Sequence, residues 1–263
     1  MHIITLTSDW NNDDFYLASI KGKLLSRCPG ITVVDLSHKV EPFKQAQAAF
    51  IIRNSFRNFP EGTIHIIAVN TEPEKGKSLL AARIAGQYFI CTDNGILGML
   101  GESEPEQVVV LPDIQAHSTT FIAFDLFADV ACSLAEGKAL EDLGSITEEY
   151  RKPASLKPTL GESSITGSVI YLDTYQNAIT NISKEFFERI VGGSDFQIFV
   201  QSKHYMLENI NTRYNETPDG ELLAIFNSLG LLEIAIRNGN AAGLLRLSTD
   251  STIRIDFKEK QNA

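Results

Sequence analysis

A charged loop follows an apolar run in the first third of the chain. The run "TIHIIAV" (63–69) is typical of a buried strand, and the next residues read "NTEPEKGK". Loops that follow buried strands often carry the functional groups of α/β proteins. Glu72, Glu74, Lys75 and Lys77 are residue types that transfer protons, so this loop is a candidate for acid–base chemistry.

A second polar cluster, "SDWNNDD" (8–14), follows the first apolar run of the chain. A carboxylate such as Asp9 at this place could accept hydrogen bonds from both hydroxyls of a ribose. Asp13 or Asp14 could instead cap a helix by accepting from its free backbone N–H groups. The cluster by itself favours the capping interpretation.

Two later clusters have the same ambiguity. "TDNG" has the composition of a turn, which makes Asp93 and Asn94 structural candidates as much as functional ones. "DTYQNAITN" places Asp173 and Asn177 four residues apart after an apolar run. A carboxylate and an amide together could hold a zwitterionic amino acid, or could organise the loop.

The first half of the chain alternates the periodicities of strands and helices, which predicts a mostly parallel sheet with helical crossovers. Strands are expected at 2–9, 31–37, 63–69, 79–86, 87–93 and 106–112, and helices at 13–29, 42–60 and 119–138.

The second half has a different texture. The stretch 151–163 contains two prolines and no apolar periodicity, which is typical of a linker. Seven short strand-like runs separated by turn residues follow, and they predict an antiparallel all-β barrel or sandwich. We therefore predict an α/β domain over 1–150, a linker over 151–163 and a β domain over 164–263.

Composition narrows the possible partners. The 263 residues carry a formal net charge of −10, which argues against a sequence-independent nucleic-acid binder. The N-terminus lacks the features of a signal peptide, and no apolar run is long enough to span a membrane. We expect a cytoplasmic protein with no nucleic-acid or membrane partner, in which Cys28, Cys91 and Cys132 are buried free thiols.

Common enzyme signatures are absent from the sequence. It contains neither a G-x-x-x-x-G-K-[ST] phosphate loop nor a G-x-S-x-G nucleophile elbow. The five histidines are not at zinc-ligand spacing. We therefore expect no metal site and no cofactor.

Taken together and in order, six stretches carry the patterns of one known family. They are "SDWNNDDFYL" (8–17, for T-D-F-G-x-x-D-x-Y-V), "DLSH" (35–38), "FPEGTIH" (59–65), "TDNG" (92–95, for P-D-N-G), "DTYQNAITN" (173–181, for D-x-F-G-N-x-x-T-N) and "NSLGLLEIA" (227–235). The chain resembles the S-adenosylmethionine (SAM) hydroxide adenosyltransferase family, relatives of the SAM-dependent fluorinase and chlorinase.

The resemblance implies a homotrimer that binds SAM, or adenosine, at the seam between one subunit's first domain and its neighbour's second. It implies that Asp9 contacts the ribose hydroxyls and that Asp173 and Asn177 hold the methionine end of the ligand. The full set of ligand-binding residues expected from the matched motifs is Asp9, Asp14, Asp93, Asn94, Asp173, Tyr175, Asn177, Ser228 and Glu233.

The implied reaction is attack at the ribose C5′ with methionine leaving as a neutral thioether. In hydroxide-transferring members, an Asp, an Arg and a His are proposed to prepare the water. Matched without gaps to V-D-P-G-V-G-T-x-R and F-H-G-R-D-I-F, this chain has Asn70 at the Asp, Lys77 at the Arg and Ile122 at the His. Neither Asn70 nor Ile122 can act as a base, and Lys77 lacks the forked guanidinium of arginine.

Three interpretations stay open. The chain could bind SAM or adenosine with weak or lost hydrolysis, or cleave SAM with water or another nucleophile by a rearranged site. It could also be a non-catalytic trimeric scaffold or regulatory protein, since Gln176 stands where the family has glycine. The halogenating branch also lacks the full trio. Halide chemistry is disfavoured, however, because Pro73 and Ala123 offer no donors to an anion.

Overall fold

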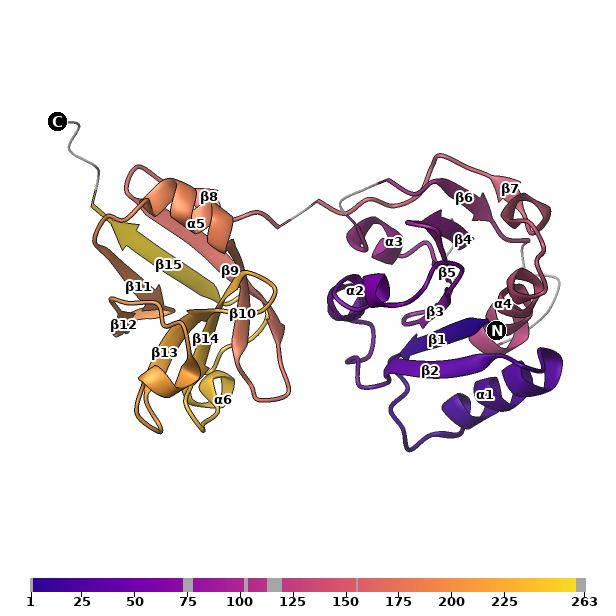
Figure 1. Cartoon of the computed structure of the whole chain (residues 1–263), viewed down its shortest axis with the longest axis horizontal. Helices are drawn as coiled ribbons and strands as arrows, with labels where there is room; N and C mark the ends of the chain where they lie inside the picture. The colour runs from indigo at the N-terminus through magenta and orange to yellow at the C-terminus, as the bar shows by residue number, and fades with distance from the viewer. Residues whose placement is uncertain (1, 73–77, 102–103, 113–119, 155, 259–263) are drawn as a thin grey trace. The chain divides into compact units, whose positions relative to one another are not determined.

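The computed structural model describes residues 2–72, 78–101, 104–112, 120–154 and 156–258. Its internal contacts divide the chain into two compact units, Met1–Ala154 and Ser155–Ala263. The first unit is α/β and the second is built on an antiparallel sheet, as the sequence predicts (Figure 1). No helix within the described residues is both long and apolar enough to cross a membrane.

The first unit contains a seven-stranded sheet in the order β2-β1-β3-β5-β4-β6-β7. Neighbouring strands run parallel from β2 through β1 and β3 to β5, and antiparallel from β5 onward. The strands are β1 (Ile3–Ser8), β2 (Thr32–Ser37), β3 (Ile64–Ala68), β4 (Leu79–Ile84), β5 (Gln87–Thr92), β6 (Gln107–Val110) and β7 (Ser145–Ile146). Because β1, β2, β3 and β5 are parallel, the loops after them meet at one edge of the sheet.

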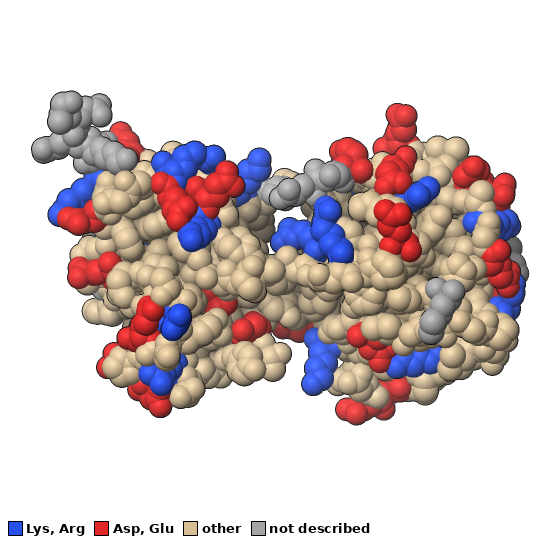
Figure 2. Space-filling model, viewed as in Figure 1, with Lys and Arg blue, Asp and Glu red and all other residues tan. Residues whose placement is uncertain are grey.

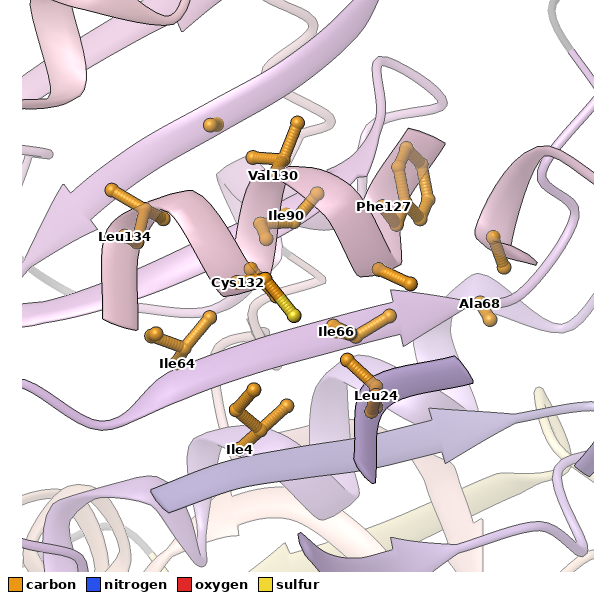
Figure 3. Close-up of a cluster of buried hydrophobic side chains, with 14 of the residues drawn as sticks. Ile4, Leu24, Ile64, Ile66, Ala68, Ile90, Phe127, Val130, Cys132 and Leu134 are labelled. Atoms are coloured by element: carbon orange, nitrogen blue, oxygen red, sulfur yellow. The ribbon is translucent and has the colours of Figure 1, made fainter. Parts of the chain in front are cut away.

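Helices cover both faces of this sheet (Figure 1). One face packs against α1 (Phe15–Arg27) and α4 (Ala128–Ala135), and the other against α2 (Gln45–Arg53) and α3 (Ile96–Met99). Figure 3 shows the first of these layers, where Ile4, Ile64 and Ile66 of the sheet face Leu24 and Phe127. Each fully buried aliphatic side chain contributes about 1.5–3 kcal/mol to folding.

Two predicted helices differ from those observed. The expected helix over 42–60 is α2 followed by a short 3₁₀ turn at Phe56–Asn58. It ends early because Asn54 Nδ2 and Ser55 Oγ donate to the carbonyls of its last turn, competing with its backbone. The expected helix over 119–138 begins as a π-helix, Ala123–Phe127, before it continues as α4.

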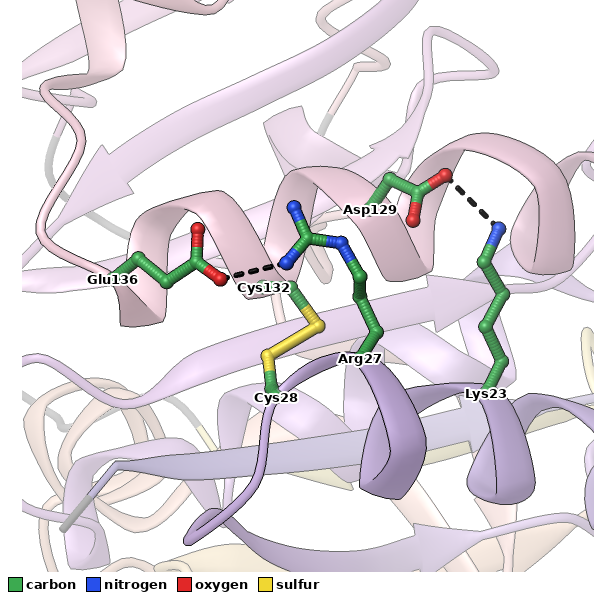
Figure 4. Close-up of a disulfide and its surroundings, with 6 residues drawn as sticks. All are labelled: Lys23, Arg27, Cys28, Asp129, Cys132 and Glu136. Carbon is green, nitrogen blue, oxygen red and sulfur yellow. Dashed lines mark hydrogen bonds and ion pairs between the residues drawn. A yellow bond between two sulfur atoms is a disulfide. The ribbon is translucent and has the colours of Figure 1, made fainter.

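The prediction of three free thiols is wrong for two of them. Cys28, at the end of α1, forms a disulfide with Cys132 of α4, with Cα atoms 5.6 Å apart (Figure 4). The ion pairs Lys23–Asp129 and Arg27–Glu136 join the same two helices. Cys91 is free and buried, as expected.

The second unit is an eight-stranded antiparallel sheet in the order β12-β11-β15-β9-β10-β14-β13, with β8 paired to β9. Its strands are β8 (Thr159–Leu160), β9 (Ser164–Leu172), β10 (Ala178–Ser183), β11 (Phe196–Val200), β12 (Ser202–Leu207), β13 (Leu222–Phe226), β14 (Leu231–Ile236) and β15 (Thr252–Phe257). The seven strand-like runs of the sequence correspond to β9–β15.

Two short helices of this unit, α5 (Lys184–Val191) and α6 (Ala241–Leu245), were not predicted. Ser183 caps α5 by accepting from Phe186 N, and Phe187 and Val191 pack into the core of the unit. Acidic and basic side chains are interspersed on the surface of each unit in the view of Figure 2. That distribution agrees with the scattered Lys and Arg residues of the sequence.

Candidate ligand-binding site

A cavity of about 660 Å³ lies at the sheet edge where the loops after β1 and β2 meet. Both loops contribute to it, and every residue that lines it belongs to the first unit. The lining residues are Asp9, Asn11, Asn12, Asp13, His38, Lys39, Val40, Glu41 and Pro42. The cluster "SDWNNDD" of the sequence therefore forms one wall of a pocket with room for a small molecule.

Asp9 is held in this cavity by backbone groups of two other loops. Its Oδ2 accepts from Phe43 N at 3.1 Å and from Asn70 N at 3.3 Å. Among the described residues, none donates to the second oxygen, Oδ1, which is available to a ligand. The carboxylate can therefore accept hydroxyl groups while the fold fixes its position.

Among the described residues, each of the three loops has one non-glycine residue in the left-handed region. They are Asn11 (φ 62°), Phe43 (φ 66°) and Asn70 (φ 48°). Asn tolerates this conformation, but it is uncommon for an aromatic side chain, and Phe43 is 69% exposed. Strained residues of this kind concentrate at functional sites. Sequence reasoning did not single out Phe43, because its role rests on a backbone N–H.

The turn "TDNG" supports the loop that contains Asn70. Asn94 Nδ2 donates to the carbonyls of Val69 and Asn70, both at 3.1 Å, so Asn94 positions a residue that touches Asp9. Asp93 does something else, since its Oδ1 accepts from Arg151 N at 2.8 Å. The structure thus gives both residues roles within the fold.

Asp14 is the N-cap of α1, where its side chain accepts from Phe15 N at 2.8 Å. This contact is the one that the capping interpretation of the sequence predicts. Tyr16 in the first turn of α1 packs against Trp10 and Phe121, with ring centroids 5.8 and 4.9 Å away. The motif that carries Asp9 therefore also anchors the start of α1.

The structure describes two of the three positions of the expected water-preparing trio, Asn70 and Ile122. Of these two, only Asn70 is polar. Ile122 is 5% exposed and lies in the core cluster between the sheet, α1 and α4. Phe124, which matches the arginine of F-H-G-R-D-I-F, stacks on Phe121 with centroids 5.4 Å apart, and Lys23 Nζ lies 4.8 Å from its ring centre. Asn70 keeps its backbone contact with Asp9, whereas Lys77 lies outside the described residues.

In the second unit, the structure brings Asp173 and Asn177 together. Asp173 Oδ1 accepts from Asn177 N at 2.8 Å, and Oδ2 accepts from Asn177 Nδ2 at 3.2 Å. Gln176, between them, is left-handed with φ 65°, so it keeps the conformation for which glycine is suited. Tyr175 is 77% exposed on the same loop.

Glu233 lies in β14 and is only 3% exposed. Tyr214 OH donates to its Oε1 at 2.6 Å, and Asn227 Nδ2 donates to its Oε2 at 3.1 Å. Both oxygens are thereby used inside the unit, where they hold the side chains of Tyr214 and Asn227 in place. Ser228 follows Asn227 and is exposed in the turn between β13 and β14.

Tyr214 is a residue that sequence reasoning missed, since nothing in its local pattern marks it. Burial raises its pKa, and so do the hydrogen bond to Glu233 and the charges of Glu233 and Asp173. The phenol therefore stays protonated and remains a hydrogen-bond donor beside two carboxylates. Among the described residues, no group of three or more His, Cys, Asp or Glu side chains could hold a metal ion.

The first unit thus places a fixed carboxylate in a cavity at the carboxyl edge of a parallel sheet, and the second carries a compact polar cluster on an antiparallel one. Such a two-unit protein has the parts of a small-molecule binder. The chain matches the SAM hydroxide adenosyltransferase N-terminal domain over residues 4–144 and the C-terminal domain of the same family over 167–254. It belongs to the SAM hydroxide adenosyltransferase family.

Named relatives agree with this assignment, and a solved structure has a similar fold. The chain is 29% identical to a (R)-S-adenosyl-L-methionine hydrolase of Thermus thermophilus, over 97% of this chain and 100% of that protein. It is 27% identical to a fluorinase of an Actinoplanes species, over 74% of this chain and 76% of that protein. A crystal structure of an uncharacterised conserved protein from Thermotoga maritima matches with a TM-score of 0.85 and 25% identity, covering 97% of this chain and 100% of that chain.

Proposed function

We propose that this protein binds SAM or adenosine through Asp9 and that its hydrolysis of SAM to adenosine and methionine is weak or lost. The observation that carries the proposal is the contrast between two sites. Asp9 is fixed by two backbone N–H groups with one oxygen available. Ile122, where the resemblance implies a histidine, is buried in the apolar core.

The chemistry of the site supports binding more strongly than hydrolysis. A fixed carboxylate oxygen can accept two ribose hydroxyls, and Asp173 with Asn177 could receive an amino-acid end. Hydrolysis also needs a group that takes a proton from the attacking water. Neither Asn70 nor Ile122 can take that proton.

Active cleavage of SAM is the second candidate function. It is favoured by the relatives named (R)-S-adenosyl-L-methionine hydrolase, one of which aligns over 97% of this chain. A sulfonium is already a good leaving group, so an enzyme that only aligns and desolvates water could still accelerate the reaction. Because those relatives are named for the R epimer of SAM at sulfur, that epimer is included among the ligands tested.

The non-catalytic scaffold is less well supported than either of these. It was suggested by Gln176, which stands at a family glycine. Gln176 nevertheless adopts a left-handed conformation, and the adjoining Asp173–Asn177 contacts are intact. We therefore favour a pocket that still takes a ligand.

Calorimetry with SAM and with adenosine tests the binding, and chromatography of adenosine and methionine tests the hydrolysis. We expect heat with at least one ligand and product release near the uncatalysed rate. In Asp9→Asn, we expect the affinity to fall about ten- to a hundredfold, because an amide cannot replace a charged acceptor of two hydroxyls. Asp142→Asn, an exposed carboxylate of the same unit, is the matched control.

Three outcomes decide between the candidate functions. The absence of heat with either ligand, at concentrations where a millimolar binder would show, would overturn the binding proposal. Product release well above background with either SAM epimer, abolished in Asp9→Asn, would favour the active enzyme. Equal affinities in Asp9→Asn and in the wild type would remove Asp9 from the site.

Assembly and location complete the proposal. We propose a homotrimer with the ligand at the seam between neighbouring subunits, on the strength of the family resemblance. A cytoplasmic location also stays a proposal. The Cys28–Cys132 disulfide counts against it, since disulfides are uncommon in reducing compartments.

A further inference from the structure

A buried histidine contacts the residue that precedes Asp9. His38 is 4% exposed, and its Nδ1 is 2.7 Å from Oγ of Ser8. Its Nε2 lies 3.1 Å from Asp35 Oδ1. No acceptor among the described residues is aligned for a hydrogen bond with Nε2, so this second contact is electrostatic.

His38 is also part of the cavity wall. It follows β2 directly, lines the pocket, and accepts from Asn11 N through its backbone carbonyl at 2.8 Å. The motif "DLSH" that contains Asp35 and His38 has no role in the function proposed above. Its histidine nevertheless contacts the strand end that presents Asp9.

The two protonation states of His38 differ in charge and in hydrogen bonding. In the neutral ring, the carboxylate of Asp35 favours a hydrogen on Nε2, which leaves Nδ1 to accept from the hydroxyl of Ser8. In the charged ring, Nδ1 donates to Ser8 Oγ, and the Ser8 proton must turn elsewhere. Protonation therefore adds a positive charge to the cavity wall and reverses a hydrogen bond next to Asp9.

The surrounding charges determine how strongly a positive charge on His38 changes the electrostatic potential of the cavity. Asp35 also accepts from Lys21 Nζ of α1 at 2.6 Å, so its negative charge is already shared. Burial raises the pKa of Asp35, but the hydrogen bond from Lys21 and the contact with His38 outweigh that effect and keep the pKa below its ordinary value. This shift favours the ionised carboxylate of Asp35 beside the imidazole.

The cavity itself has three carboxylates and one further cation in its wall, which are Asp9, Asp13, Glu41 and Lys39. This excess of negative charge suits a ligand that carries a sulfonium. A charge on His38 would offset part of it. The effect would be smaller for a ligand of the same shape without the sulfonium charge.

We infer that His38 is a specificity-determining residue of the pocket, which admits a sulfonium ligand when neutral and disfavours it when charged. The inference rests on the proposed function. The inference goes beyond that function because it assigns a residue that senses pH and distinguishes a sulfonium from a neutral thioether. The alternative is that His38 only joins the ends of β1 and β2 through Ser8 and Asp35 and has no effect on ligand specificity.

The test compares SAM with S-adenosylhomocysteine, which lacks only the sulfonium methyl group and its charge. Dissociation constants are measured by calorimetry at about pH 7.5 and about pH 5.5. We expect the preference for SAM over the thioether to fall about three- to tenfold at the lower pH. In His38→Gln, which keeps a neutral polar side chain, the preference should be the same at both pH values.

Two more variants keep the test decisive. Asp35→Asn should move the loss of preference to lower pH, because the charged imidazole loses its carboxylate partner; it replaces His38→Gln if that variant does not fold. His204→Gln removes an exposed histidine of the second unit and should behave like the wild type.

The outcomes separate this inference from the function on which it rests. If neither ligand binds at either pH, the proposed function fails first. If both bind and the preference is the same at both pH values, only the role of His38 is overturned. A pH response that survives in His38→Gln, or disappears in His204→Gln, would also overturn it.

Discussion

The carboxylate of Asp9 divides its two oxygens between the fold and the cavity. Oδ2 receives the N–H groups of Phe43 and Asn70, so one side chain ties together the loops after β1, β2 and β3. Three left-handed residues, one per loop, are the conformational cost of this arrangement. A loop network of this kind holds the acceptor still for a ligand, whether or not a reaction follows.

Ile122 lies in apolar surroundings at the position where the family pattern has a histidine. Its side chain is 5% exposed in the cluster that also contains Phe127 and Ala131. An imidazole placed in this apolar cluster would lose its hydration, which costs about 1–3 kcal/mol where no hydrogen bond replaces it. We therefore expect Ile122→His to lower the stability of the first unit.

His65 gives a prediction at the scale of one residue. It is buried between Thr5 and Gln87, with Nδ1 2.7 Å from Thr5 Oγ1 and Nε2 2.6 Å from Gln87 Oε1. Burial lowers its pKa to about 4, against the opposing effect of the Gln87 hydrogen bond. The unfolded chain binds a proton near pH 6.5, so stability is full above that pH and falls as the pH drops toward 4.

We expect the free energy of unfolding to fall by about 2 kcal/mol between pH 7 and pH 5 through this group. Urea denaturation at the two pH values and a fixed protein concentration measures the loss. His65→Gln removes the titration, so its stability should change much less over the same interval. An equal loss in the variant would show that other groups cause the pH dependence.

At the scale of elements, the helices α1 and α4 are joined by a disulfide and two ion pairs (Figure 4). The Arg27–Glu136 pair is exposed and contributes little, whereas the Lys23–Asp129 pair is partly buried on its lysine side. The disulfide closes a long loop, because Cys28 and Cys132 are 104 positions apart in the sequence. A cross-link of that kind stabilises chiefly by restricting the unfolded chain, typically by about 2–4 kcal/mol.

Reduction should therefore lower the melting temperature of the wild-type protein. The double variant Cys28→Ala/Cys132→Ala should melt below the oxidised wild type and should not respond to reductant. Cys91→Ala is the control, because Cys91 is a buried free thiol and leaves the cross-link intact. A wild-type melting temperature that is equal with and without reductant would contradict the stabilising role of the disulfide.

The elements also show how far sequence reasoning reaches. Alternating strand and helix periodicities predicted the parallel part of the first sheet, and Asp14 caps α1 as one interpretation of its motif proposed. The disulfide was missed because a sequence separation of 104 gives no local signal of proximity. Tyr214 was missed for the same reason, since its contact with Glu233 depends on how a short 3₁₀ turn packs over β14.

At the scale of the whole molecule, the candidate ligand contacts are distributed over both units. Asp9 and the cavity belong to Met1–Ala154, whereas Asp173 and Asn177 belong to Ser155–Ala263. A complete site in the proposed homotrimer would draw its first part from one subunit and its second part from a neighbour. Such an assembly should have three times the 29.0 kDa mass of one chain in light scattering.

Mixed trimers would show which chain supplies which part. Asp9→Asn damages the first unit of a chain and Asp173→Asn the second, so trimers of either variant alone have no intact site. Co-expression of the two variants gives mixed trimers. In these, the undamaged first unit of an Asp173→Asn chain can meet the undamaged second unit of an Asp9→Asn chain. The seam between those two units has an intact site. We expect such mixtures to recover SAM binding with wild-type affinity and reduced stoichiometry in calorimetry. A mixture that binds no better than the separate variants, although light scattering finds mixed trimers, would mean that each chain builds its own site.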